Sequence, residues 1–519
     1  MASKRKRSNG PAQDAPSAPA RTVNTTPNSS SRPLLPPVVL DANESRAVNL
    51  QIITGSYEKV LHGFIASIPV TSLSSLPRNV ALTTTFSDSF LFTAHTAPLR
   101  CVALSPPSTS KSNSKSSKRI LATGSPDERV NLYTLSSSIS ALLPSASLEA
   151  KAKSTARNKH LGTLHEHTNT PCALLFTPNR NKLITAGEDS QILIFRTRDW
   201  SLLSTLKAPK PKSSASASGI GLLGNGERPG GVNDIALHPS QKLLLSVSKG
   251  ERALRMWNLM TGRKAGALAF TREVMGSTLG NKIGGSSGDG QKVRWSPVGE
   301  EFAVAFERGV VVFGMDSQPK LRILPSPISK VHQIHYITLP GDDAYVLAIS
   351  TEDGRIIFYS TTAPRKTKAE ESENDGGIDI DNPIVLGHVG GREMGMVGRV
   401  KDFVILEADK ALFPVSAGSD GTIRIWAVDI EQIKERLTAV GSSAEPPSKK
   451  AKKPESDQPA ASAARKIPQL GNLVGIYETG KRVTCLSGMV MEEGWNINEA
   501  DESDEDETDK DEEREDSDG

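Results

Sequence analysis

The sequence has little cysteine, few aromatic residues and no long apolar run. It holds three cysteines in 519 residues, and aromatic residues make up 5% of the chain. Cys101, Cys172 and Cys485 are far apart and each lies in an apolar stretch, which indicates buried thiols in a reducing compartment rather than a disulfide framework. No run of 18 apolar residues occurs, and an apolar signal segment is missing after Met1. We therefore expect a soluble intracellular protein with no membrane partner.

Hydrophobic residues are also scarce, and this shortage is concentrated in particular segments. They make up 37% of the chain, and tracts of Ser, Pro, Lys and Glu cannot bury a core. We expect an ordered body over 47–492, a disordered basic segment over 1–46 and a disordered acidic tail over 493–519. Residues 499–519 hold fourteen acidic residues against Lys510 and Arg514, a net charge of −12, which leaves +15 elsewhere because the whole chain carries +3. Such a basic body suits surroundings rich in nucleic acid, where the tail competes for the basic surface.

A repeat of fixed spacing runs through the body. An acidic residue in a tight turn is followed, six residues later, by an aromatic residue that ends an apolar run. The seven turn acids are Glu58, Asp127, Asp189, Glu251, Glu307, Asp353 and Asp420. The seven aromatic residues are Phe64, Tyr133, Phe195, Trp257, Phe313, Tyr359 and Trp426. Seven copies of one offset predict seven hairpins of the same kind, with these residues in structural roles.

Further strands complete each repeat. Asp-Gly at 353–354 and 420–421 favours the positive φ angles of a primed hairpin turn. Upstream strands are predicted at 99–105, 170–176, 232–238, 292–296 and 400–405. With a less regular strand after each aromatic residue, every unit has about four strands, which is one blade of a propeller. The fold class is therefore all-β, a seven-bladed β-propeller with polar loop insertions.

The first hairpin, which begins at Gln51, has no upstream strand of its own. The segment 482–488 mirrors the strand predicted at 99–105, with an apolar run around a cysteine in both. We therefore expect strand 482–488 to close the first blade. This pairing would close the ring and leave it without free strand edges.

These units resemble the WD40 family. The family's turn acid is present seven times, but its Trp-Asp dipeptide is absent, since Asn258 follows Trp257 and Ala427 follows Trp426. The family also places a histidine at the start of a blade, and here the candidates are His95, His167 and His388. The resemblance implies that these three blades form a hydrogen-bonded cluster of histidine, acid and aromatic residue. The remaining blades would rely more on packing.

Polar insertions and basic clusters lie between and outside the predicted blades. The insertions are expected near 106–118, 136–160, 208–230, 271–291, 362–383 and 441–466. Two basic clusters are candidate signals for a nuclear import receptor: Lys4, Arg5, Lys6 and Arg7, and Lys449, Lys450, Lys452 and Lys453. The alternative for either cluster is a solvated run of charge.

Motifs for catalysis, cofactors and metals are weak. The glycine string at 219–224 matches a dinucleotide fingerprint in letters only, because no buried strand precedes it and no helix follows. His165, His167 and Cys172 have no fourth metal ligand nearby. We therefore predict no catalytic residue, no metal, no cofactor and no enzymatic activity. A catalytic pair assembled from distant loops stays open as an alternative.

Four segments narrow the resemblance to the PAK-interacting-protein family of WD40 factors. They are 55–64, 185–189, 232–263 and 293–297, and the resemblance covers most of 52–428 and the closing strand. Fungal members of that family assist assembly of the large ribosomal subunit. The resemblance implies an assembly factor of the nucleus and nucleolus, monomeric within a larger particle, with pre-60S proteins and pre-rRNA as partners. The alternative is a signalling adaptor that binds and restrains a p21-activated protein kinase.

Overall fold

The computed structural model describes eleven segments of the chain. They are 47–70, 84–107, 118–137, 159–209, 230–271, 273–275, 288–339, 345–362, 380–396, 398–442 and 467–491. Both candidate import clusters, the glycine string and the two terminal segments predicted as disordered lie outside these residues. Most of each predicted insertion does too.

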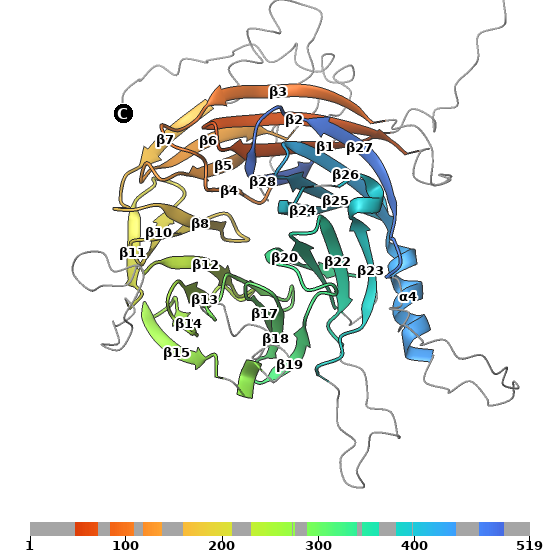
Figure 1. Ribbon diagram of the computed structural model, residues 1–519. Coiled ribbons are helices and arrows are strands. Elements are labelled where there is room, and N and C mark those ends of the chain that lie inside the picture. Colours follow the sequence, from red (N-terminus) through yellow and green to blue (C-terminus); the bar gives the residue numbers. More distant parts are fainter. Residues whose placement is uncertain are drawn as a thin grey trace, which may run out of the picture.

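The described residues form seven four-stranded antiparallel sheets arranged in a ring (Figure 1). The seven-bladed propeller predicted from the repeat is therefore confirmed. The first strand of each blade contacts the first strands of the neighbouring blades. These first strands line the centre of the ring, and the fourth strands lie outermost.

The first three blades come from the N-terminal part of the chain and one strand near its C-terminus. Blade 1 consists of β28 (Val483–Val490), β1 (Ala47–Ser56), β2 (Val60–Pro69) and β3 (Thr85–Thr93). Blade 2 consists of β4 (Cys101–Leu104), β5 (Lys118–Gly124), β6 (Val130–Ser136) and β7 (Lys159–Leu164). Blade 3 consists of β8 (Pro171–Phe176), β9 (Lys182–Gly187), β10 (Gln191–Arg196) and β11 (Leu202–Lys207).

The other four blades follow in chain order. Blade 4 consists of β12 (Val232–Leu237), β13 (Leu243–Ser248), β14 (Ala253–Asn258) and β15 (Arg263–Ala269). Blade 5 consists of β16 (Lys292–Trp295), β17 (Glu301–Ala305), β18 (Val310–Gly314) and β19 (Pro319–Ile323). Blade 6 consists of β20 (Val331–Thr338), β21 (Tyr345–Thr351), β22 (Arg355–Ser360) and β23 (Val385–Gly390). Blade 7 consists of β24 (Val400–Ala408), β25 (Ala411–Gly418), β26 (Thr422–Asp429) and β27 (Asn472–Glu478).

Each repeat aromatic residue lies on the third strand of its blade and is buried. In all seven blades, the register between the third and fourth strands shifts immediately before this residue. A β-bulge bends the strand and increases its twist. The repeat therefore places its largest side chain where the outer half of every blade bends.

The hairpin turns after the second strands differ in one detail from the predicted geometry. Gly354 and Gly421 have φ angles of 84° and 86°, but the aspartates before them do not have positive φ. A primed type I turn needs positive φ at both central residues. Each turn instead puts the acid before a single left-handed residue, which glycine adopts without steric cost.

The ring closes within blade 1. Strand β28 pairs with β1 from Leu50 opposite Val490 to Ser56 opposite Val483. Figure 1 shows β28, from the end of the described chain, beside β1 from its beginning. Two strands more than 400 residues apart in sequence thus share one sheet.

The core is divided into seven hydrophobic clusters, each between two adjacent blades. Cys485, for example, packs with Ile53 of its own blade and Leu121 of blade 2. A blade therefore buries its two faces against its two neighbours, so that no blade has a complete core by itself.

One helix was not predicted from the sequence. Helix α4 (Ile430–Ser442) follows β26, begins before the insertion predicted at 441–466 and lies on the outside of the ring (Figure 1). The helix buries Ile433 against the cluster between blades 6 and 7. Within the described segments, no helix has the length and apolar content needed to cross a membrane.

Candidate functional site

Blades 2 and 3 hold their turn acids with a histidine from the loop before the first strand. His95 Nδ1 lies 3.0 Å from Asp127 Oδ2, and His95 Nε2 lies 2.8 Å from Thr123 Oγ1. In blade 3, His167 makes the same contacts with Asp189 at 2.9 Å and Thr185 at 2.7 Å. Each cluster ties a loop to a turn and to the second strand. Its geometry is that of a structural cross-link.

In blade 2, the electrostatics fit a neutral His95 beside an ionised Asp127. Burial lowers the pKa of His95, against the opposing effect of Asp127. Burial raises the pKa of Asp127 and Asp189, but the histidine contacts and backbone N–H donors outweigh it, and the net pKa of both carboxyl groups is lowered. A neutral His95 donates from Nδ1 to the carboxylate and accepts the Thr123 hydroxyl at Nε2.

The other turn acids are held without a histidine. Glu251 pairs with Arg255, Asp353 with Arg355, Asp420 with Arg424, and Glu307 with Lys330. In blade 1, Glu58 accepts a hydrogen bond from the backbone N–H of Arg482 at 3.1 Å, next to the closing strand. The acid position thus recurs in every blade, while the group that contacts the acid changes.

The prediction that His388 begins a blade is wrong. His388 lies inside β23, the outermost strand of blade 6, where it pairs with Ile357. Its Nδ1 is buried and has no hydrogen-bond partner among the described residues. The loop that leads to blade 7 begins only after Gly390. The dipeptide Gly387-His388 therefore lies in the strand before that loop, where it cannot reach Asp420.

A central channel lies within the described part of the ring. Its volume is about 550 Å³, and residues from the first strands of all seven blades line it. At one end of the channel, the wall contains Arg100 and Lys292, which lie where first strands begin. At the other end it contains Pro178 and Pro297, which lie just after first strands end. The first strands start level with the acidic turns, as the pairing of Cys101 with Gly124 shows. We call this side of the ring the turn face.

Five of the seven first strands carry a β-bulge near their start. The residues skipped in the pairing are Cys172, Asn233, His332, Lys401 and Thr484. All but Asn233 line the channel. A bulge re-aims a side chain that would otherwise follow the alternation of the strand, so these bulges add polar side chains to the channel wall.

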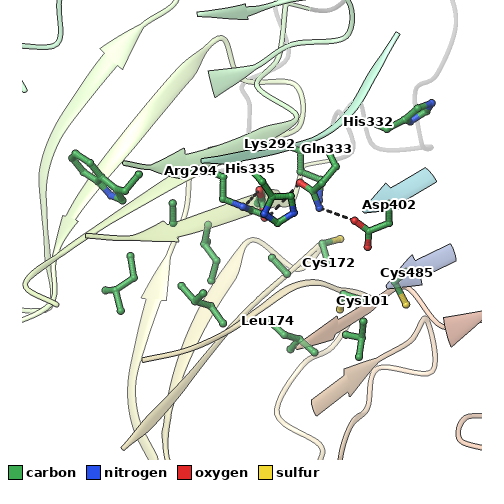
Figure 2. Close-up of a pocket in the computed structure, with 18 of the residues that line it drawn as sticks. Cys101, Cys172, Leu174, Lys292, Arg294, His332, Gln333, His335, Asp402 and Cys485 are labelled. Carbon is green, nitrogen blue, oxygen red and sulfur yellow. Dashed lines mark hydrogen bonds and ion pairs between the residues drawn. The ribbon is translucent and has the colours of Figure 1, made fainter. Parts of the chain in front are cut away.

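A chain of polar contacts, which we call the channel belt, links five first strands. Arg294 Nη1 donates to Asp234 at 2.6 Å, and Arg294 Nη2 donates to Gln333 at 3.3 Å. Gln333 Nε2 donates to Asp402 at 3.1 Å, and Asp402 accepts the backbone N–H of Leu486 at 2.9 Å. Figure 2 shows Arg294, Gln333 and Asp402 in line along the wall. The belt joins blades 4, 5, 6, 7 and 1.

Cations surround the channel mouth on the turn face. Arg100, Lys292 and Lys401 line the channel, and none of them forms an ion pair with a described residue. Burial, followed by the charges of Arg399, Arg482 and Arg100, lowers the pKa of Lys401. Arg100 and Lys401 are thus close enough to repel one another.

The three cysteines meet at the channel, although they are far apart in sequence. All three are free and buried, and all three line the cavity (Figure 2). Burial raises the pKa of Cys485 to about 12, and burial is also the main cause of the raised pKa of Cys101 and Cys172. Thiols in this state are poor nucleophiles. Cys101 Sγ donates instead to the carbonyl of Pro171 at 3.4 Å, linking blades 2 and 3.

The site suits an anionic partner better than a metal or a covalent reaction. No group of three or more metal-ligating side chains occurs in the segments that the structure describes, and His165 does not join His167 and Cys172 in one. Sequence reasoning identified the turn acids but missed the belt and the channel cations. A feature of the sequence could have indicated the channel wall: each upstream strand has a polar residue or a cysteine one or two positions after its start.

Known proteins are similar to this chain over up to 74% of its length. The family described as WD domain, G-beta repeat matches residues 158–196, which span β7 to β10. Protein MAK11 of Saccharomyces cerevisiae is 26% identical over 402 residues, covering 74% of this chain and 78% of that protein. The p21-activated protein kinase-interacting protein 1-like of Gallus gallus is 26% identical over 384 residues, covering 74% of each chain. Shk1 kinase-binding protein 15 of Schizosaccharomyces pombe is 23% identical over 228 residues, covering 40% of this chain and 54% of that protein.

Proposed function

We propose that this chain, a closed seven-bladed propeller with a WD40 repeat match at residues 158–196, acts as a non-catalytic scaffold in assembly of the large (60S) ribosomal subunit and maturation of pre-rRNA. The similarity to MAK11 over 74% of the chain carries the proposal, because it spans most of the propeller. WD40 propellers generally bind partners rather than catalyse reactions. Fold alone does not assign a partner, so the argument also needs the chemistry of the surface.

The channel mouth and the charge of the body support a partner rich in negative charge. The chain outside residues 499–519 carries a net charge of +15, and Arg100, Lys292 and Lys401 have no acidic partner among the described side chains. Such a surface speeds encounter with nucleic acid and with the particles that contain it. We propose pre-60S proteins and pre-rRNA as partners, a nuclear import receptor as the carrier and the nucleolus as the site of action, with the protein a monomer within the particle.

Depletion of the protein tests this role. We expect a lower ratio of 60S to 40S subunits in sucrose gradients and accumulation of unprocessed precursors of large-subunit rRNA. A tagged chain should sediment with pre-60S particles and concentrate in the nucleolus. A balanced subunit ratio after depletion, with the tagged protein free of particles, would rule the proposal out.

A second candidate function is an adaptor that binds and restrains a protein kinase. The names of the chicken and fission-yeast relatives favour it, since each describes interaction with a kinase. Capture of a p21-activated kinase by purified chain, with lowered kinase activity, would support this function. Sedimentation and capture are independent measurements, so they distinguish the two functions in one set of cells.

A further inference from the structure

We propose that the channel mouth on the turn face is a docking site for an acidic polypeptide segment, and that the segment is this chain's own residues 499–519. Three features support this docking: the arrangement of charge around the mouth, the acidity of residues 499–519 and the place where the described chain ends. It concerns the charge of the channel alone, so it can be tested whether or not the ribosomal role holds.

Charges on the turn face are arranged in two rings. The outer ring contains the turn acids, most of which are neutralised locally. Glu307 pairs with Lys330, for example, and Glu352 pairs with Arg399 at 3.2 Å. The inner ring consists of the residues at the starts of the first strands, where positive charge is in excess.

Three inner-ring cations remain available to a ligand. Arg100 is exposed, while Lys292 and Lys401 are partly exposed in the channel wall. The mouth has two acids within the belt: Arg294 neutralises Asp234, and Asp402 accepts hydrogen bonds from Gln333 and Leu486. Burial also raises the pKa of Asp402. An acidic ligand would relieve the repulsion between Arg100 and Lys401.

His332 extends this cluster. Burial and then the charges of Lys401, Lys330 and Arg399 lower its pKa to about 4. The imidazole is therefore neutral at pH 7 and offers the mouth a hydrogen-bonding group without opposing charge. The ionisable groups that line the channel are cationic or neutral, apart from the two belt acids, and Glu188 and Glu352 lie just outside the lining.

The end of the described chain puts the acidic segment within reach. Strand β28 lines the channel with Thr484 and Cys485, and Met491 follows it at the end opposite the turn face. Seven residues separate Met491 from Glu499, roughly 25 Å of extended chain. The eight residues of β28 span about the same length, so the first tail acid reaches the level of the mouth if the chain turns back along the channel.

Tethering favours this segment over a separate acidic peptide. A short flexible link holds a ligand at an effective concentration near the millimolar range. The tail carries a net charge of −12, which exceeds the charge of the three mouth cations fourfold. Different acidic residues of such a segment can take turns in contacting the mouth cations. An anionic partner that binds more strongly can displace the segment.

The test uses the full chain and a variant in which the fourteen acidic residues of 499–519 are replaced by Asn and Gln. A fluorescent synthetic peptide of residues 499–519 is added, and binding is followed by anisotropy at low salt. The variant should bind the peptide, and the native chain should bind it at least about tenfold more weakly, because its own tail occupies the site. Equal binding by the two chains would overturn the proposal.

Substitutions at the mouth locate the site. In the neutral-tail background, Arg100→Gln, Lys292→Gln and Lys401→Gln together should weaken peptide binding at least about tenfold. The matched control is Arg129→Gln, Lys249→Gln and Arg308→Gln, which removes the same charge from exposed positions in the outer turns. An equal loss in both triple variants would show nonspecific attraction and contradict the proposal. Thermal melting of both variants identifies any that do not fold.

A direct measurement uses the native chain. Zero-length coupling of carboxylates to amines, followed by peptide mapping, should join tail residues to Lys292 or Lys401. Links confined to lysines outside the channel would contradict the docking site. Single-stranded RNA that binds through the three mouth cations and is not displaced by the peptide would assign the mouth to nucleic acid instead, and would also overturn the proposal.

Discussion

Blades 2 and 3 and blades 4 to 7 fix the same turn with different chemistry. In blades 2 and 3 a histidine approaches the acid, and the side chains of Asp127 and Asp189 are 8% and 3% exposed. In blades 4 to 7 an arginine or lysine takes that role, and Asp420 is 36% exposed. A buried carboxylate needs a partner of fixed geometry, whereas an exposed one is already stabilised by water.

The difference shows which part of the repeat is essential to the fold. The position of the acid and of the bulged aromatic residue recurs in all seven blades, but the hydrogen-bonded cluster does not. Blades 4 to 7 have in compensation the channel belt, which crosses between blades rather than within one. Blades 4 to 7 thus add side-chain contacts between blades to the ion pairs within them, whereas blades 2 and 3 depend mainly on the histidine cluster within each blade.

The largest expected loss of stability comes from removing the closing strand β28, because the ring that contains both groups of blades depends on it. Deleting residues 481–492 removes the partner of β1 and the buried side chains of Val483, Cys485 and Leu486. We expect a loss of about 5 kcal/mol or more in the free energy of unfolding, seen as a broad or much lower melting transition by calorimetry. Deleting residues 211–222, an equal length from a predicted insertion, is the control. An unchanged melting temperature after the deletion of 481–492 would contradict the role of β28 in closing the ring.

The next effect separates the two kinds of turn. Asp189→Ala leaves His167 and the backbone N–H of Gln191 without their acceptor in a buried site, and should cost about 3 kcal/mol. Asp420→Ala removes an exposed acid and should cost less than about 1 kcal/mol. Urea denaturation of the two variants gives both values. Equal losses would mean that the histidine clusters add nothing that the arginine pairs lack.

The channel belt should contribute more to the free energy of unfolding than the hydrogen bond from Cys101 to Pro171, which links blades 2 and 3. Asp402→Ala leaves Gln333 and the backbone N–H of Leu486 without an acceptor, and should cost about 2 kcal/mol. Cys101→Ala removes a thiol contact to Pro171 and should cost about 1 kcal/mol. The same denaturation experiment compares them, with Asp402→Asn as an intermediate control that keeps one acceptor. A larger loss for Cys101→Ala would reverse the order of the two regions.

The smallest effect concerns pH. Burial, then the charge of Arg294, lowers the pKa of His335 from 6.5 to about 3. Between those values the unfolded chain binds a proton that the folded chain excludes, so the free energy of unfolding falls as the pH falls from 6.5. His335→Gln should lose less stability between pH 7 and pH 5 than the native chain. Identical pH profiles would confine acid sensitivity to other groups.

The repeat made most of the fold predictable. A fixed offset between acid and aromatic residue is local, so one sequence reveals it, and the predicted upstream strands at 170–176 and 232–238 match β8 and β12 within a residue. The belt could not be predicted in the same way. Gln333 and Asp402 are 69 residues apart, and nothing local marks them as partners before the ring is closed.

Two errors have local causes. Gly387-His388 has the letters of a blade start, but its neighbours Val385 and Val389 pair with the third strand and draw the dipeptide into β23. Helix α4 follows directly from β26 and buries Ile430 and Ile433 among its described side chains, so its apolar pattern is short and resembles a polar insertion. In both places tertiary pairing outweighs a weak local signal.

The pairing of β28 with β1 has a consequence for synthesis of the protein. A ribosome releases β1 among the first ordered residues and β28 among the last, so β1 exposes an unpaired edge while the other six blades are being made. A nascent chain in this state can recruit a chaperone or pair wrongly with another copy. Any premature stop before residue 483 would leave that edge permanently open, whatever the quality of the preceding blades.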